Sequence, residues 1–129
     1  MEYRIRTTKT QEFIDITGII KEEVKKSGTK EGIVVVFIPH VTAGITINEN
    51  ADPDVVSDIL CVLSKVIPES HSYRHLEGNS PAHIKASLFG SSCTIIIENG
   101  ELKLGTWQGA YFCEFDGPRE RKICIKIMK

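Results

Sequence analysis

Hydrophobic and polar positions alternate over much of the chain with the two-residue period of β-strands. Residues 3–7 and 14–16 show this alternation on either side of a polar stretch, which predicts a β-hairpin at the N-terminus. The run Gly32–Ile38 is rich in β-branched residues and predicts a buried strand. Asn99-Gly100 predicts a tight turn between two strands. Further strands are predicted over residues 93–98, 107–115 and 122–128.

Three segments carry helix signals. Thr17 is placed to cap a helix that ends near Gly28. Asp52-Pro53 joins an acidic N-cap to a proline in the first helical turn, and predicts a helix to about Val66. Its apolar positions are expected to point inward: Val55, Val56, Ile59, Leu60, Leu63 and Val66. Ser80-Pro81 repeats the cap-and-proline signal for a short helix that ends at Gly90.

Strands therefore dominate, with two or three helices between them. We predict an α+β fold in one compact domain over residues 1–129, mostly antiparallel β-sheet or sandwich. A chain of 129 residues is long enough to bury one core and too short for two.

Composition excludes several classes of partner. The chain has 16 Lys+Arg and 17 Asp+Glu, without a basic stripe, so we expect no nucleic-acid binding. No apolar run approaches the roughly 20 residues of a membrane helix, and the N-terminus has no signal-peptide pattern, so we expect no membrane association. Four widely spaced cysteines without a C-x-x-C motif indicate reduced thiols in a cytoplasmic protein.

Short polar side chains follow the strand that ends near Ile38. Alternation along an extended segment would place His40, Thr42, Thr46 and Asn48 on one face. A solvent-facing edge strand explains this pattern as well, but the face has no Lys, Arg or Glu. We interpret it as a surface that lines a site.

Three of the four histidines lie between residues 71 and 83. His75 is predicted on a loop and His83 in the first turn of the following helix, close enough to bind one divalent metal. Zinc is the expected metal, with magnesium and manganese as alternatives. Glu77 or His40 would supply a third ligand. The helix start would offer an anion site, with Ser80 and Lys85 as phosphate donors. Surface histidines remain the alternative.

A third cluster spans residues 104–121. Trp107, Tyr111, Cys113 and Phe115 share a parity and are predicted to lie in the core, with Glu114 on the opposite face. Arg121 is expected either to bind phosphate or to pair with Glu114 or Asp116. The chain has no Gly-x-Ser-x-Gly, P-loop or dinucleotide-binding pattern.

These clusters resemble the YjbQ-like family, which is named for a weak thiamine-phosphate synthase activity. The resemblance rests on His40-x-Thr42-Ala43 with Asn48-Glu49-Asn50-x-Asp52-Pro53, on His75-x-Glu77-Gly78-Asn79 with Ala82-His83-Ile84-Lys85, and on Gly105-Thr106-Trp107-Gln108-Gly109 with Glu114 and Arg121. It implies a β-rich homotrimer with a histidine site near the subunit boundaries.

The resemblance also implies roles for individual residues. His40, His75 and His83 are the expected metal ligands, and His40, His83, Glu49 and Glu114 are the expected catalytic residues. The expected phosphate-binding residues are Thr42, Asn79, Ser80, Lys85 and Arg121, and Asp58 and Glu77 are expected near the pocket.

The implied reaction couples an aminopyrimidine diphosphate to a thiazole phosphate and releases pyrophosphate, with a metal stabilising the leaving group. Two alternatives stay open. One is a metal-dependent hydrolase of a phosphorylated metabolite, and the other is a non-catalytic trimeric protein that binds such a metabolite.

Overall fold

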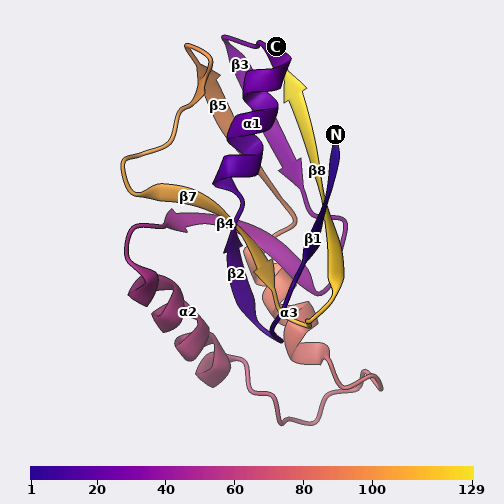
Figure 1. Cartoon of the computed structure of the whole chain (residues 1–129). Coiled ribbons are helices and arrows are strands. Elements are labelled where there is room, and N and C mark those ends of the chain that lie inside the picture. The colour runs from indigo at the N-terminus through magenta and orange to yellow at the C-terminus, as the bar shows by residue number, and fades with distance from the viewer.

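Two antiparallel β-sheets and three helices form the fold in a computed structural model that describes all residues from Met1 to Lys129. The elements are β1 (Glu2–Arg6), β2 (Glu12–Asp15), α1 (Thr17–Ser27), β3 (Gly32–Phe37), β4 (Ala43–Glu49), α2 (Pro53–Val66), α3 (Ser80–Phe89), β5 (Ser92–Glu98), β6 (Glu101–Leu102), β7 (Gln108–Glu114) and β8 (Glu120–Met128). One sheet has the order β1-β8-β3-β5-β6 and the other β2-β7-β4 (Figure 1). The predicted α+β class is confirmed.

The predicted N-terminal hairpin is wrong, because β1 and β2 belong to different sheets. β1 pairs with β8, where Ile5 lies opposite Arg121, and β2 pairs with β7, where Ile14 lies opposite Phe112. The carboxylate of Glu12 accepts hydrogen bonds from the backbone N–H groups of Thr8 and Lys9, which shapes the connection. Each short strand thus pairs with a longer strand from the C-terminal part of the chain.

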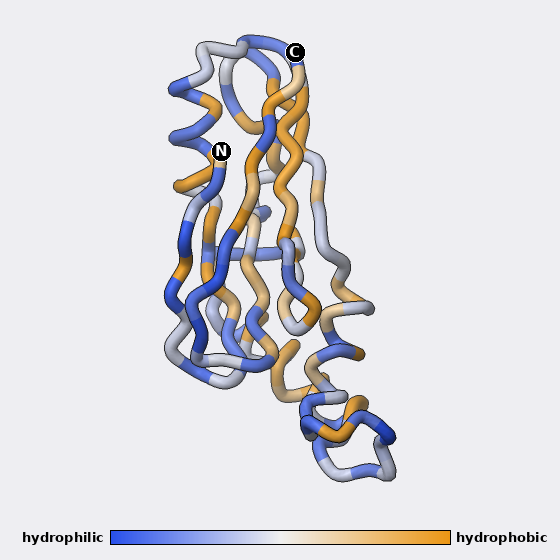
Figure 2. The backbone as a smooth tube through the Cα atoms, turned by 90° about the vertical axis from the view of Figure 1, so that its right-hand side faces the viewer, coloured by the Kyte–Doolittle hydropathy of each residue, from blue (hydrophilic) through white to orange (hydrophobic).

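The main core lies between the two sheets and α1. It contains fifteen buried residues, among them Val34 and Val36 of β3, Phe112 of β7 and Ile123 of β8. Figure 2 shows hydrophobic segments concentrated along the central strands and hydrophilic ones in the loops.

Strand β7 is buried on both faces. Phe112 contacts the main core, while the alternate residues Tyr111 and Cys113 pack with Phe115 against α3 in a second cluster. The predicted core positions of these three residues are confirmed. Trp107 is the exception, because it precedes β7 and its side chain is 62 % exposed.

Helix α2 begins at Pro53, as predicted, with the Asp52 carboxylate accepting a hydrogen bond from the Asp54 N–H. Its predicted apolar face is covered only in part, since Val66 is 68 % exposed and the other five residues predicted to point inward are half-buried. The helix extends beside the sheets rather than between them (Figure 1), and only Val56 and Leu63 of this face pack against the second cluster.

The N-terminus of α1 also differs from expectation. Thr17 is the first helical residue rather than the cap, and the Asp15 carboxylate accepts hydrogen bonds from both its N–H and its hydroxyl. The Thr17 hydroxyl oxygen accepts in turn from the backbone N–H of Ala110, which fastens α1 to β7.

The longest helix, α2, has 14 residues, and no helix combines the length and apolarity needed to cross a membrane. The cysteines form no disulfide. Burial raises the pKa of the Cys93 thiol to about 11 and that of Cys113 further still, so these two thiols are protonated and unreactive at neutral pH.

Candidate functional site

Segments from three parts of the chain converge on one polar cleft of about 420 Å³. They are the β3–β4 connection, the segment from the α2–α3 loop into the first turn of α3, and the β7–β8 connection with the start of β8. The lining residues are Pro39, His40, Val41, Thr42, His75, Glu77, Asn79, His83, Asp116, Arg119 and Arg121. The cleft therefore gathers three histidines and two arginines beside three acidic or amide side chains.

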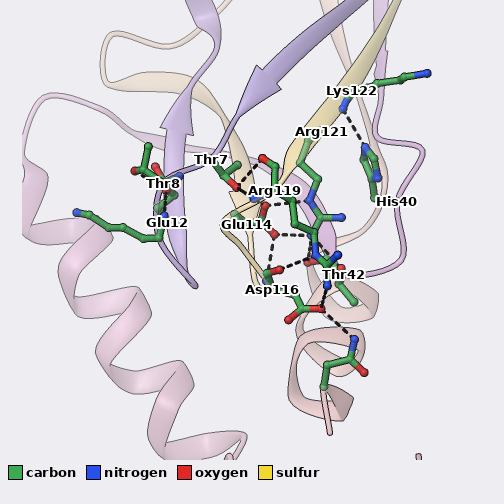
Figure 3. A network of polar contacts seen from close by, with 12 residues as sticks. Thr7, Thr8, Glu12, His40, Thr42, Glu114, Asp116, Arg119, Arg121 and Lys122 are labelled. Atoms are coloured by element: carbon green, nitrogen blue, oxygen red, sulfur yellow. Dashed lines mark hydrogen bonds and ion pairs between the residues drawn. The ribbon is translucent and has the colours of Figure 1, made fainter. Parts of the chain in front are cut away.

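A buried ion pair between Arg121 and Glu114 forms the base of this site (Figure 3). Arg121 Nε donates to Glu114 Oε1 at 2.9 Å, and its Nη2 donates to Glu114 Oε2 and to the Thr42 hydroxyl, the latter at 2.9 Å. The Thr7 hydroxyl donates to Glu114 Oε1 at 2.7 Å. The carboxylate is therefore fully engaged, and the guanidinium is held in one orientation.

These contacts keep Glu114 ionised. Burial alone would raise the pKa of Glu114, but the hydrogen bonds from Arg121, Thr7 and the Asp116 N–H outweigh it and hold that pKa below its usual range. An ionised carboxylate whose oxygens already accept several hydrogen bonds is unsuited to proton transfer. The expected catalytic role of Glu114 is replaced by a structural one, the orientation of Arg121.

One nitrogen of the Arg121 guanidinium is left without a hydrogen bond to the protein. Its Nη1 has no hydrogen-bond partner in the chain, whereas Nε and Nη2 are engaged by Glu114 and Thr42. Of the roles that the sequence left open for Arg121, the structure shows the pairing with Glu114, and it leaves Nη1 able to donate to an anion.

A second polar group joins the start of α3 to the β7–β8 connection. Asn79 Nδ2 donates to Asp116 Oδ2 at 2.9 Å, and Arg119 donates to the same oxygen from Nη2 at 3.1 Å. Because a carboxylate only accepts, this contact fixes the amide orientation of Asn79. Its Oδ1 is then buried without a hydrogen-bond partner.

His40 is held by the strand beside it. The pairing of β3 with β8 stops at Phe37, and beyond that point the backbone N–H of Lys122 donates to His40 Nε2 at 2.9 Å. Burial and the positive charge of Arg121 lower the pKa of His40. The imidazole is therefore neutral at pH 7.

His75 and His83 contact each other, which confirms the convergence that their spacing predicts. Their ring centroids are 5.1 Å apart and the rings are nearly perpendicular, at 88°. His75 is exposed on the loop, and His83 is half-buried in the first turn of α3. His71 lies outside this cleft and contacts Tyr73 instead.

The expected three-histidine metal site is not assembled within one chain. No group of three or more His, Cys, Asp or Glu side chains is close enough together to hold a metal ion. His40 lines the same cleft as His75 and His83, but its Nε2 is already occupied by the Lys122 N–H. The residues of one chain therefore do not fit a three-ligand site.

The expected anion site at the start of α3 is also absent. Pro81 has no N–H, and the N–H groups of Ala82 and His83 both donate to the Asn79 carbonyl, at 3.0 and 3.3 Å. Ser80 does not line the cleft. This end of the helix therefore has few free donors for a phosphate.

Lys85 points away from the cleft. Its side chain is 1 % exposed, and Nζ donates to Gln11 Oε1 at 2.8 Å and approaches Glu69 Oε1 at 3.4 Å. It therefore joins α3 to the β1–β2 connection and to the loop after α2. The prediction that Lys85 binds phosphate disagrees with this position.

Two further expected residues lie elsewhere. Glu49 is at the far end of β4 from Thr42, opposite Gln108 of β7, and so roughly 20 Å away at the rise of an extended strand. Asp58 is exposed on α2. Neither lines the cleft, because β4 and α2 both lead away from it.

The structure is therefore a two-sheet α+β domain with a polar cleft lined by histidines and arginines. The chain belongs to the YjbQ-like family, UPF0047, whose model matches residues 1–129.

Relatives and solved structures agree with this assignment. The UPF0047 protein MJ1081 of Methanocaldococcus jannaschii is 55 % identical over 127 residues, covering 98 % of this chain and 92 % of its own. YugU of Bacillus subtilis is 53 % identical over 126 residues, covering 97 % and 96 %. A YjbQ/UPF0047 family protein of Clostridium acetobutylicum, solved by crystallography, has a TM-score of 0.98 and 63 % identity, covering 99 % of each chain. Protein TT1486 of Thermus thermophilus has a TM-score of 0.92 and 36 % identity, with the same coverage.

Proposed function

We propose that the cleft binds a small phosphate-bearing metabolite and that the protein is an enzyme acting on it. The observation that carries this proposal is the buried ion pair that orients Arg121 toward a cleft containing three histidines. Arg121 Nη1 and the Arg119 guanidinium supply positive charge at the cleft, although Arg119 also contacts Asp116. Such donors hold phosphate oxygens well because the guanidinium is planar and always charged.

The family resemblance favours one reaction, the coupling of an aminopyrimidine diphosphate to a thiazole phosphate. The carbon–oxygen bond to the diphosphate breaks, the thiazole nitrogen forms a bond to that carbon, and pyrophosphate leaves. Arg121 and Arg119 would stabilise the charge that develops on the leaving group. His75 and His83, whose rings have no backbone partner, would donate a proton to it.

The test is an assay of pyrophosphate release with both substrates, with each alone, and with neither. We expect release only when both are present. His83→Ala should reduce the rate by at least tenfold, as general acid catalysis contributes about 10²–10⁴-fold. His71→Ala is the matched control, because His71 is a histidine of the same loop that does not line the cleft. An equal loss of rate in both variants would show that the cleft is not the site of the reaction.

A non-catalytic binding role is the second candidate. It is favoured by the engagement of Glu114, which leaves the cleft without a buried carboxylate free for proton transfer. Binding of both substrates without turnover would support it. Phosphate release from a single substrate would instead indicate a hydrolase.

We also propose that the chain forms the homotrimer that the resemblance implies. The support is two exposed valines one helical turn apart on α2, Val62 and Val66, which are 55 % and 68 % exposed. Light scattering coupled to size exclusion should give three times the 14.4 kDa mass of one chain. Val62→Lys/Val66→Lys should dissociate the assembly, whereas Lys65→Glu on the same helical turn is the control for a charge change alone.

A further inference from the structure

The position of His40 restricts the chemistry that its imidazole can perform. An imidazole nitrogen that accepts an N–H hydrogen bond must carry a lone pair and no proton. The Lys122 N–H donates to His40 Nε2 at 2.9 Å, so Nε2 is the unprotonated nitrogen. In the neutral ring the proton must then be on Nδ1.

The backbone makes this arrangement hard to reverse. Lys122 lies in β8, which is paired with β1 on its other side through the Arg4 position, so its N–H cannot move without disturbing the sheet. Protonating Nε2 would place two donors against each other at hydrogen-bond distance. The neighbouring Arg121 cation opposes a second positive charge on the ring, and this disfavours the doubly protonated form.

Nδ1 has no hydrogen-bond partner within the chain, while the ring lines the cleft. We propose that His40 is a fixed, neutral hydrogen-bond donor to the ligand through Nδ1–H, and that it neither binds a metal nor acts as a general base. Both of those roles require a free lone pair, and the only lone pair of this tautomer is occupied by Lys122. The proposal rests on the proposed ligand-binding function and assigns His40 a specific part in it.

A donor of this kind favours an acceptor-rich ligand. His40 Nδ1–H and Arg121 Nη1 belong to neighbouring side chains and both present hydrogen atoms, so together they suit two oxygens of one phosphate group. Neutral His40 would contribute orientation, and Arg121 would contribute the charge.

The first test is the tautomer itself, measured on the whole ¹⁵N-labelled protein at pH 7 by long-range ¹H–¹⁵N correlation of the histidine rings. His40→Asn identifies the His40 signals by their loss. We expect the Nδ1–H tautomer, and we expect it to be unchanged when one equivalent of Zn²⁺ is added. An Nε2–H tautomer, an imidazolium ring, or a zinc-induced loss of the Nδ1 proton would overturn the proposal.

The second test compares affinity for inorganic phosphate by titration of the same protein. His40→Asn keeps an amide donor near the Nδ1 position and should bind phosphate within about threefold of wild type, whereas His40→Leu should bind about tenfold more weakly, the effect of one hydrogen bond to a charged group. Unchanged affinity in His40→Leu would overturn the role of His40 alone. Wild type that binds no phosphate, with the Nδ1–H tautomer present, would instead overturn the proposed function and leave the tautomer assignment standing.

Discussion

Arg121 and Glu114 form a buried ion pair that joins the two sheets. Glu114 is the last residue of β7 in the three-stranded sheet, and Arg121 is the second residue of β8 in the five-stranded one; their side chains are 0 % and 6 % exposed. This ion pair links the two sheets and also orients the Arg121 guanidinium that lines the cleft. Fold stability and ligand binding therefore depend on one contact.

Glu114→Gln should destabilise the protein by about 3 kcal/mol, since removing one partner of a buried pair leaves the other charge uncompensated. Chemical denaturation at pH 7 measures this change in the free energy of unfolding. The control is Glu120→Gln, which breaks an exposed pair with Arg4 at 3.2 Å and should cost less than about 1 kcal/mol. Equal changes in the free energy of unfolding would show that the buried pair stabilises the protein no more than the exposed one.

The same carboxylate predicts a pH dependence. Because the pKa of Glu114 is lower in the folded than in the unfolded protein, its contribution to stability is present above the unfolded value, about 4, and is lost as the pH falls through the folded pKa. The difference in unfolding free energy between wild type and Glu114→Gln should therefore shrink below about pH 4. Denaturation of both proteins from pH 6 to pH 3 tests this, and a constant difference over that range would contradict it.

Lys85→Met should lower stability by roughly 1–3 kcal/mol, because a buried hydrogen-bonded ammonium is lost and Gln11 is left without its donor. Phosphate affinity should stay within about twofold of wild type, since Nζ points away from the cleft. Denaturation and phosphate titration separate the two effects. Lys103→Met, at an exposed pair with Glu98, is the control. A folded Lys85→Met protein with strongly weakened phosphate binding would restore the predicted phosphate role.

Two glycines should respond to alanine in opposite directions. A Cβ on Gly44 of β4 would lie 2.7 Å from the Gly90 carbonyl oxygen and 3.3 Å from Phe89 Cβ, so the backbone of the α3–β5 connection would have to move. We expect Gly44→Ala to destabilise by roughly 1–3 kcal/mol. Gly18 of α1 has nothing within 4 Å of such a Cβ, and Gly18→Ala should stabilise by up to about 1 kcal/mol. Thermal unfolding compares both, and a neutral Gly44→Ala would show that this connection is free to shift.

The strands were predictable because their signal is local. The alternation in β8 and the Asn99-Gly100 turn are visible in short windows of sequence. Which strands pair with each other was not predictable from short windows, since β1 pairs with β8, which lies more than a hundred residues further along the chain. Helix α2 shows the converse limit, because its apolar pattern predicts burial without specifying what covers it.

In the candidate site, too, contacts between residues close in the sequence were predictable and long-range contacts were not. His75 and His83 are eight residues apart, and their contact follows from a short bend of the chain. Thr7 reaches Glu114 across 107 residues, and no motif indicates it. The direction of Lys85 could have been inferred, because residues two apart on a helix differ by about 200°, so that if His83 faces the cleft Lys85 faces away.

Measuring the metal content of the purified protein shows which of the cleft histidines can bind a metal ion. His40→Asn should leave the metal content of the purified protein unchanged, because Nε2 of His40 is occupied by the Lys122 N–H and is not available to a metal. His75→Ala/His83→Ala should remove any zinc that wild type retains, since these two rings are the imidazoles in contact. Elemental analysis of the untagged proteins measures the metal content of wild type, of His40→Asn and of the double variant.

Wild type without stoichiometric metal is the result that the ligand set of a single chain predicts. Metal that persists in wild type and in His40→Asn but not in the double variant would place the ion on His75 and His83, with its remaining ligands from water or a neighbouring subunit. Loss of metal in His40→Asn would contradict the tautomer that the Lys122 hydrogen bond imposes, and would return His40 to the metal site that its sequence motif first suggested.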